Sequence, residues 1–267
     1  MDALRLYFRF ISIRIRAQMQ YPAPFLLDLA GTAIGTLMYF AALAAVLARF
    51  HTVGGWGLGE LAFLYGLAET AFATMDLIFN SFDPDAFSLL VQRGMLDQMF
   101  LRPLSLPLQI FGADFVLRRL GRIAQGAAVF GLSLYWTQAA WTPLKGLYLG
   151  VVFVSTVAFF GGLFVFGATS CFWTVQRLEA INIFTYGGVE LISYPMHIYN
   201  DWLRRFFTYV IPAALLTYYP SLYFLGKPIP PGQAWLPFLS PLAGFGVLAA
   251  AFAFWTVGVR RYTSTGT

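Results

Sequence analysis

The sequence predicts an all-α integral membrane protein with six transmembrane helices, an interfacial N-terminal helix and a re-entrant hairpin before the last span. Of its 267 residues, 59% are hydrophobic and only 11% are charged, whereas soluble domains carry roughly 25% charged residues. The mean hydropathy is +0.68. The apolar residues also gather in runs of about 20, the length that crosses the hydrocarbon core of a bilayer.

The first element expected is an amphipathic helix over residues 1–24. At 100° per residue its polar side chains share one narrow stripe: Asp2, Arg5, Arg9, Ser12, Arg16 and Gln20. A helix with arginine on its polar face lies in the membrane interface rather than across it. We therefore expect Arg5, Arg9 and Arg16 to face lipid headgroups, and Pro22 and Pro24 to end this helix before the first span.

The transmembrane domain then occupies residues 25–267. Its six expected spans are Phe25–Leu47, Leu58–Phe79, Leu117–Trp136, Leu147–Trp173, a helix from Ala180 that is interrupted at Tyr194-Pro195, and Trp235–Val259. A long polar stretch, residues 80–116, separates the second span from the third. Its alternating charged and apolar residues predict short helices in a loop.

The apolar segment Phe206–Leu225 is either a seventh span or part of a re-entrant segment over residues 195–234. Six spans with both termini cytoplasmic place 12 basic side chains inside and 5 outside, against 11 and 6 for seven spans. Cytoplasmic loops are enriched in arginine and lysine, so six spans are favoured. Pro212 and Pro220 also favour broken helices there.

Ionisable residues inside the spans are candidates for a translocation path. Glu69, Asp76 and Asn80 follow an i, i+7, i+11 spacing and so share one face of the second span. Because charges at membrane depth are costly, this face either lines a water-filled path or pairs with arginines such as Arg118 or Arg122. Glu190, beside the break at Tyr194, either borders the path or is a solvated helix end.

Several enzyme classes lack their motifs in this chain. It has no G-x-x-x-x-G-K-[ST] phosphate loop, no H-E-x-x-H motif and only two histidines, so we expect neither catalysis nor a metal site. The net charge of +5 comes from arginines that flank apolar spans. Anionic lipids explain this pattern better than nucleic acid does.

Two motifs carry a family resemblance. Residues 92–110, QRGMLDQMFLRPLSLPLQI, resemble the cytoplasmic loop of ABC-2 type permeases, which reads R-G-x-L-D-x-x-L-x-R-P-L-S. The matching residues are Arg93, Gly94, Leu96, Asp97, Leu101, Arg102, Pro103, Leu104 and Ser105, with Phe100 as a departure. The segment around the fifth span resembles the same group at Tyr194, Pro195, Ile198, Tyr199, Pro212, Ala213, Tyr219 and Pro220.

The resemblance implies a permease subunit of an ATP-driven exporter in the bacterial plasma membrane. Such permeases form dimers, of one chain or of two homologous chains, on two copies of a separate ATPase that binds ATP and magnesium. This chain would then hold no cofactor itself. Its loop would dock on the ATPase through Arg93, Gly94, Leu96, Asp97, Leu101, Arg102 and Pro103, unless Asp97 and Arg102 only maintain the fold of the loop.

Two other functions compete with the permease function. A stand-alone ion-coupled transporter would use Glu69, Asp76 and Glu190 as proton sites, although the chain shows no inverted repeat. A scaffold subunit without transport would form complexes but would not couple to ATP hydrolysis. Neither alternative explains the loop motif.

Overall fold

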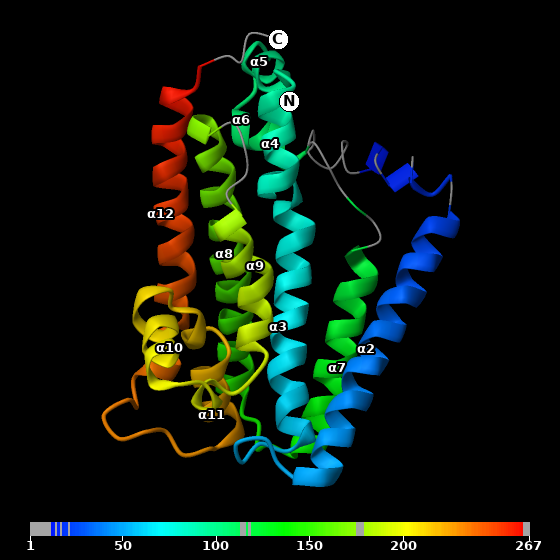
Figure 1. The fold of residues 1–267 in the computed structure, drawn as a ribbon, viewed down its shortest axis with the longest axis vertical. Helices are drawn as coiled ribbons and strands as arrows, with labels where there is room; N and C mark the ends of the chain where they lie inside the picture. The colour runs from blue at the N-terminus through cyan, green and yellow to red at the C-terminus, as the bar shows by residue number, and fades with distance from the viewer. Residues whose placement is uncertain are drawn as a thin grey trace.

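The computed structural model describes residues 12–13, 15–16, 18–20, 22–112, 116, 119–174 and 179–263. Within these ranges the chain is helical apart from turns, loops and one isolated bridge between Val53 and Trp56. Long helices run side by side along the longest axis of the molecule (Figure 1). They are α2 (Pro22–Phe50), α3 (Leu58–Phe79), α7 (Arg119–Thr137), α8 (Pro143–Thr174), α9 (Glu179–Ile192) and α12 (Ser240–Arg261).

Four helical stretches of the described chain are long and apolar enough to cross a membrane. They are residues 29–50, 58–92, 143–174 and 240–261. The chain is therefore a multi-pass membrane protein. Helix α9 has 14 residues, or about 21 Å at 1.5 Å per residue, and a hydrocarbon core is about 30 Å thick. The count of six spans stays a prediction, in which α7 and α9 are the additional crossings.

Some predicted boundaries were wrong. Helix α2 begins at Pro22 rather than at Phe25, so Pro22 and Pro24 lie in its first turn, while the described helical residues before it end at Gln18. A first-turn proline lacks only an N–H that has no intrahelical partner, so it starts a helix without cost. Helix α12 begins at Ser240 rather than at Trp235, because a short 3₁₀ turn, η5 (Leu236–Phe238), comes first.

The predicted interfacial helix is described only in part. Ser12, Ile13, Ile15, Arg16 and Gln18 are helical, and Arg16 is exposed. Arg5 and Arg9 lie outside the described residues. The interfacial position of this segment stays a prediction.

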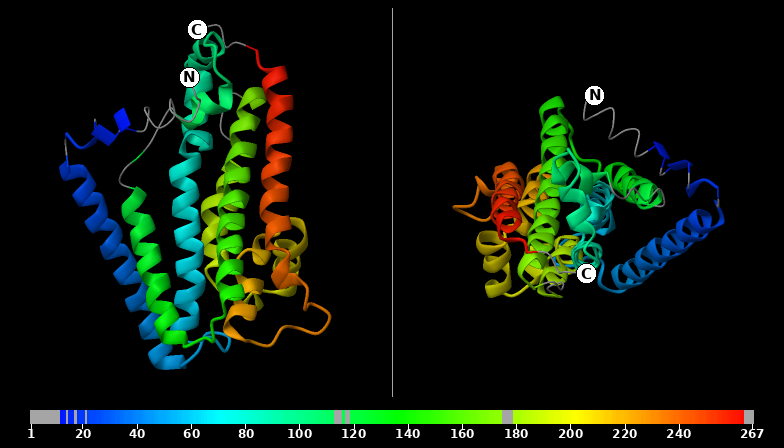
Figure 2. Two further views of the ribbon diagram at one scale, coloured as in Figure 1. Left: turned by 180° about the vertical axis from the view of Figure 1, so that it is seen from behind. Right: turned by 90° about the horizontal axis from the view of Figure 1, so that it is seen from above.

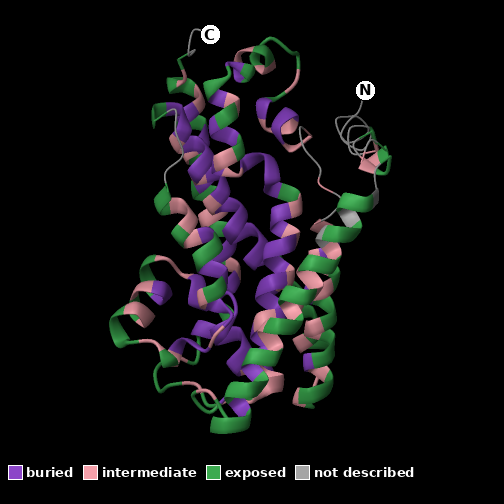
Figure 3. Cartoon of the chain, turned by 45° about the vertical axis from the view of Figure 1, so that its right-hand side comes forward, coloured by how far each residue is buried: buried purple, intermediate pink, exposed green. Residues whose placement is uncertain are grey.

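Helices α3 and α8 form the buried centre of the bundle (Figure 3). Eight phenylalanines are among its largest fully buried side chains: Phe63, Phe72, Phe82, Phe87, Phe159, Phe160, Phe164 and Phe224. Glycines allow the close pairing of α3 with α7 and of α8 with α12. A Cβ at Gly66 would lie 2.6 Å from the backbone nitrogen of Phe130, and one at Gly244 would collide with the carbonyl oxygen of Ser155. Membrane helices depend on such close packing because lipid provides no hydrophobic force between them.

Helix α2 is attached differently. It leans away from the bundle (Figure 2), and only 6% of the residues in its most apolar stretch are buried. It touches α7, where Gln125 Nε2 donates to the carbonyl oxygen of Leu29 at 3.1 Å. It touches α3, where the rings of Tyr39 and Tyr65 stack at 4.5 Å. Most of its apolar surface is left without a protein neighbour.

The segment between α9 and α12 enters and leaves at the same end of the bundle (Figure 1). It consists of η2 (Met196–Ile198), α10 (Asp201–Arg205), the π-helical η3 (Phe206–Val210), η4 (Ala213–Leu215), α11 (Tyr218–Leu225) and η5. Its longest helix, α11, has 8 residues, so residues 206–225 do not form a seventh span.

The chain path of this segment follows the predicted breaks. Helix α9 ends at Ile192, just before Tyr194 and Pro195. Pro212 precedes η4, and Pro220 lies in the first turn of α11. Thr217 Oγ1 donates to the carbonyl oxygen of Ile192 at 2.8 Å, which ties the turn to the end of α9. The segment therefore begins and ends at one end of the bundle, and the re-entrant hairpin stays a prediction.

Replacing Gly244 with alanine should weaken the pairing of α8 with α12. The added methyl group meets backbone atoms of Ser155, and such overpacking costs roughly 1–3 kcal/mol. We expect a lower melting temperature in detergent, measured by intrinsic fluorescence. Gly246→Ala on the same helix is the matched control, because a Cβ there meets nothing within 4 Å. Equal melting temperatures for the two variants would contradict this packing.

Candidate translocation site and coupling loop

Two ion pairs join α3 to α7 inside the bundle. Arg119 Nη1 lies 2.6 Å from Asp76 Oδ1, and Arg122 Nη2 lies 3.0 Å from Glu69 Oε2. Arg119 also donates to the carbonyl oxygen of Asp76, and Arg122 Nε donates to Glu69 at 3.1 Å. Both carboxylates are buried. Each pair lowers the cost of placing a charge among membrane-spanning helices.

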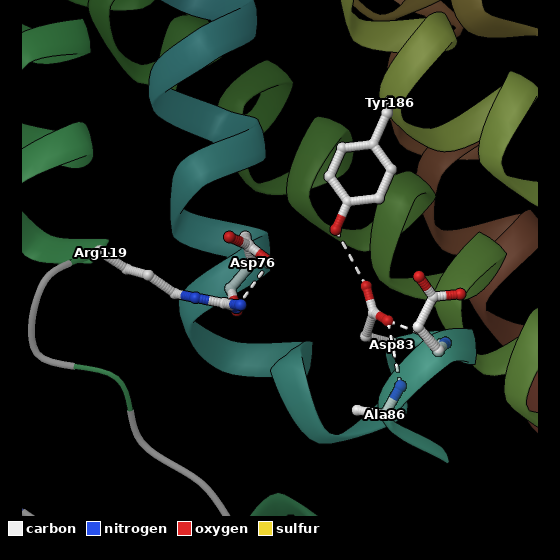
Figure 4. A network of polar contacts seen from close by, with 6 residues as sticks. Asp76, Asp83, Ala86, Arg119 and Tyr186 are labelled. Carbon is white, nitrogen blue, oxygen red and sulfur yellow. Dashed lines mark hydrogen bonds and ion pairs between the residues drawn. The ribbon is translucent and has the colours of Figure 1, made fainter. Parts of the chain in front are cut away.

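The structure thus pairs the second-span carboxylates with arginines, one of the two possibilities that the sequence left open. Glu69 has the expected partner, Arg122. Asp76 binds Arg119 (Figure 4), whereas Arg118 lies outside the described residues. Asn80 is buried at the start of η1 (Asn80–Phe82). Sequence reasoning did not name Arg119, although Arg119 and Arg122 are three residues apart and so share a helix face, a spacing that could have indicated both partners.

A polar cavity of about 240 Å³ lies between α2, α3, α7 and α9. Its lining residues are Thr32, Gly35, Thr36, Tyr65, Glu69, Arg122, Gln125, Gly126 and Glu190. The cavity brings together Glu69 and Glu190, two of the four predicted path residues. Asp76 and Asn80 do not line it. The threonines and Gly35 of α2 were missed, although Thr32 and Thr36 follow an i, i+4 spacing in the first span.

The predicted coupling loop folds into three short helices that follow the C-terminal end of α3. They are α4 (Pro84–Gln92), α5 (Met95–Phe100) and α6 (Leu106–Phe111). Gly94 adopts a φ of 62°, the left-handed conformation that favours glycine, and so turns the chain from α4 into α5. Leu96 is fully buried. Arg93 is exposed beside this turn.

The tip between α5 and α6 is exposed but held in place. Leu101 is 87% exposed, and Arg102 and Pro103 are exposed beside it. Beneath the tip, the buried Gln109 donates from Nε2 to the carbonyl oxygens of Met99 at 2.9 Å and Leu104 at 3.0 Å. An apolar side chain and a cation are therefore presented on a fixed turn.

Hydrogen bonds from two tyrosines connect this loop to the long helices, besides the packing of Phe87 against Phe172 and Trp255. Tyr186 of α9 donates to Asp83 Oδ2 at 2.9 Å, while Asp83 Oδ1 caps α4 by accepting from the backbone of Asp85 and Ala86 (Figure 4). Tyr262, at the end of α12, donates to Asp97 Oδ1 at 3.1 Å. Its ring also stacks on Phe100, with centroids 5.6 Å apart. Sequence reasoning missed Tyr262 because 165 residues separate it from Asp97.

The comparison with known families identifies the family of this chain. A family model described as ABC-2 family transporter protein matches residues 33–266. The chain belongs to this ABC-2 family. Neither a curated protein nor a solved structure matches it.

Membership makes this chain an ABC transporter permease. The match runs from within α2 to beyond α12 and includes the loop and, apart from Thr32, the residues that line the polar cavity. Within the described ranges, no group of three or more metal-ligating side chains occurs. The polar features that the structure shows in this ABC-2 permease are its ion pairs, its polar cavity and its exposed loop.

Replacing Asp76 with asparagine should leave Arg119 as an unpaired charge in the bundle. Breaking a buried pair on one side costs about 3 kcal/mol, and we expect this loss in the free energy of unfolding, measured by SDS titration in mixed micelles. Asp201→Asn is the control, because its pair with Arg204 is solvent-exposed and contributes about 0.5 kcal/mol. Equal losses for both variants would argue against a structural role for the Asp76 pair.

Replacing Tyr262 with phenylalanine should loosen α5 without removing the ring stack. Burial and the Asp97 carboxylate raise the pKa of Tyr262 above its ordinary value, so the phenol stays protonated up to about pH 10. Its stabilising contribution is fully present below that pH and is lost as the pH rises through the folded-state pKa. We expect amide exchange in α5 to become about fivefold faster. The acceleration should be equal at pH 6 and pH 9, and a difference between these pH values would contradict this assignment.

Proposed function

We propose that this ABC-2 permease is the membrane subunit of an exporter whose energy comes from a separate ATPase. Two ATPase copies would bind ATP and magnesium beneath a dimer of permeases, formed by two copies of this chain or by this chain and a homologous one. The assembly would lie in the bacterial plasma membrane, with both termini and the α4–α6 loop in the cytoplasm.

The exposed tip of the α5–α6 turn is the observation that carries this proposal. Leu101 is 87% exposed, and Phe100 and Met95 beside it on α5 are 43% and 37% exposed, so apolar surface is grouped at this end of the loop, as at sites where proteins interact. Arg102 beside it would add charge complementarity toward an acidic groove. Because Gln109 holds the turn in one conformation, little entropy would be lost on docking.

Movement of the tip would reach the bundle through the two loop contacts. Asp83 links the start of α4 to Tyr186 on α9, and Asp97 links α5 to Tyr262 after α12. A shift of α4 would therefore pull on α9, which borders the polar cavity through Glu190. This route connects ATP binding in the partner with the proposed path.

The exposure of α2 supports a second permease. Leu27, Leu37 and Met38 are 74%, 70% and 69% exposed in the single chain. Lipid alone could cover them, but Glu190 is also exposed on α9. A carboxylate facing lipid is costly, so a partner surface that encloses a polar path against α2 and α9 is the favoured arrangement.

Reversing the charge at the tip tests the proposal. When the chain is expressed together with its neighbouring genes, we expect Arg102→Glu to reduce co-purification of the proposed ATPase about tenfold, since like-charge contacts cost several kcal/mol. Vanadate-sensitive ATP hydrolysis of the purified complex should fall in parallel. Arg205→Glu, an exposed charge reversal at the opposite end of the bundle, should change neither.

Asp97→Arg is a less specific variant, because it also breaks the contact with Tyr262. Substrate transport by the chain in liposomes without any ATPase would overturn the proposal and favour an ion-coupled transporter. Recovery of an ATPase that is unaffected by Arg102→Glu would move the docking site away from the tip.

A further inference from the structure

The polar cavity carries one negative charge that the described residues do not neutralise. Of its charged lining residues, Glu69 is bound by Arg122 at 3.0 Å. Glu190 makes neither an ion pair nor a side-chain hydrogen bond with any residue that the structure describes. A carboxylate in this position is costly unless something positive accompanies it.

The wall beside Glu190 is aromatic. Tyr65 lines the cavity, and its ring stacks on Tyr39 at 4.5 Å. The ring of Tyr194, four residues after Glu190 and just past the end of α9, lies 6.4 Å from that of Tyr39. Aromatic faces attract cations, and a carboxylate beside such rings is typical of sites for organic ammonium groups.

The remaining lining residue with a free acceptor is Gln125. Its amide nitrogen is already used by the carbonyl oxygen of Leu29, and its Oε1 is buried without a hydrogen-bond partner in the described chain. A buried acceptor without a donor is unfavourable. A ligand that brings an N–H or O–H group would satisfy it.

We propose that this cavity binds the ammonium group of an organic cation, with Glu190 as its counter-ion and Tyr65, backed by Tyr39, as its aromatic wall. The inference deepens the proposed function, on which it rests for its interpretation as a substrate site. An anion would meet an unneutralised carboxylate. The charge of Arg122 is balanced by Glu69, to which its Nε and its Nη2 are both bound, so the charged lining residues sum to one negative charge.

The size of the cavity limits what it can hold. Pockets for drug-sized molecules span about 300–1,000 Å³, and this cavity measures about 240 Å³. It therefore accepts a small ammonium headgroup, and any larger body of the ligand must extend outside it. Free amines and lipid headgroups share this chemistry.

Binding of choline to the full chain in nanodiscs of phosphatidylglycerol tests the charge. We expect choline to bind at least about tenfold more tightly than its neutral isostere 3,3-dimethylbutanol, and Glu190→Gln to remove this preference. Glu179→Gln, in the first turn of the same helix and away from the cavity, is the control and should bind like the unmodified chain. Equal binding of choline and its isostere would overturn the proposal.

Filling the cavity is an independent test of the location. Gly35 lines the cavity and a Cβ there meets nothing within 4 Å, so Gly35→Leu should fold while occupying the ligand space. Gly31→Leu, one turn away with equally open surroundings and outside the lining, is the control. Choline binding should be lost only in Gly35→Leu, and retention in both variants would overturn the location.

Nanodiscs that contain phosphatidylethanolamine distinguish the two sources of the ammonium group. Competition with choline would indicate a lipid headgroup in the cavity, and unchanged choline affinity would indicate a soluble amine. Because no ATPase is present, these measurements are independent of the docking experiment. Intact choline binding without ATPase coupling would contradict only the exporter function. ATPase coupling without choline binding would contradict only the ammonium site.

Discussion

The bundle depends on the requirement that charges and backbone polar groups at membrane depth find partners inside the protein. Helix α3 carries Glu69 and Asp76 in its apolar run, where an uncompensated charge is costly. Arg119 and Arg122 meet them from α7, which fixes the register of these two helices. The glycine contact of Gly66 with the Phe130 backbone then allows the two helices to lie close together.

Side-chain contacts hold the segment between α9 and α12 in place. Lys227 lies 2.8 Å from Glu60 Oε1, donates to the carbonyl oxygen of Gly55 and rests 4.8 Å from the ring centroid of Trp56. His197 Nε2 lies 2.6 Å from the carbonyl oxygen of Gly54. The broken helices between α9 and α12 are thus tied to the loop that precedes α3.

The surfaces that the proposed function uses are those that the rest of the chain does not cover. The centre around α3, α8 and α12 is closed by phenylalanines and glycine contacts, whereas α2 and the α5–α6 tip are exposed. The polar cavity lies where the loosely held α2 meets α3, α7 and α9. A permease that changes shape would be expected to move along such a weakly packed boundary while its core stays intact.

The sequence by itself determined the membrane class, the order of the long helices, the helix break before Pro195 and the family, because apolar run length, proline and short motifs are local signals. Only the tertiary structure decided which charges meet. Glu69 and Asp76 were recognised as one helix face, but their partners are 53 and 43 residues away. The Tyr262–Asp97 contact, the Tyr39–Tyr65 stack and the position of Glu190 on the cavity likewise depend on how distant helices pack. Periodicity along one helix records which residues share a face, but it contains no information about the neighbour that this face meets.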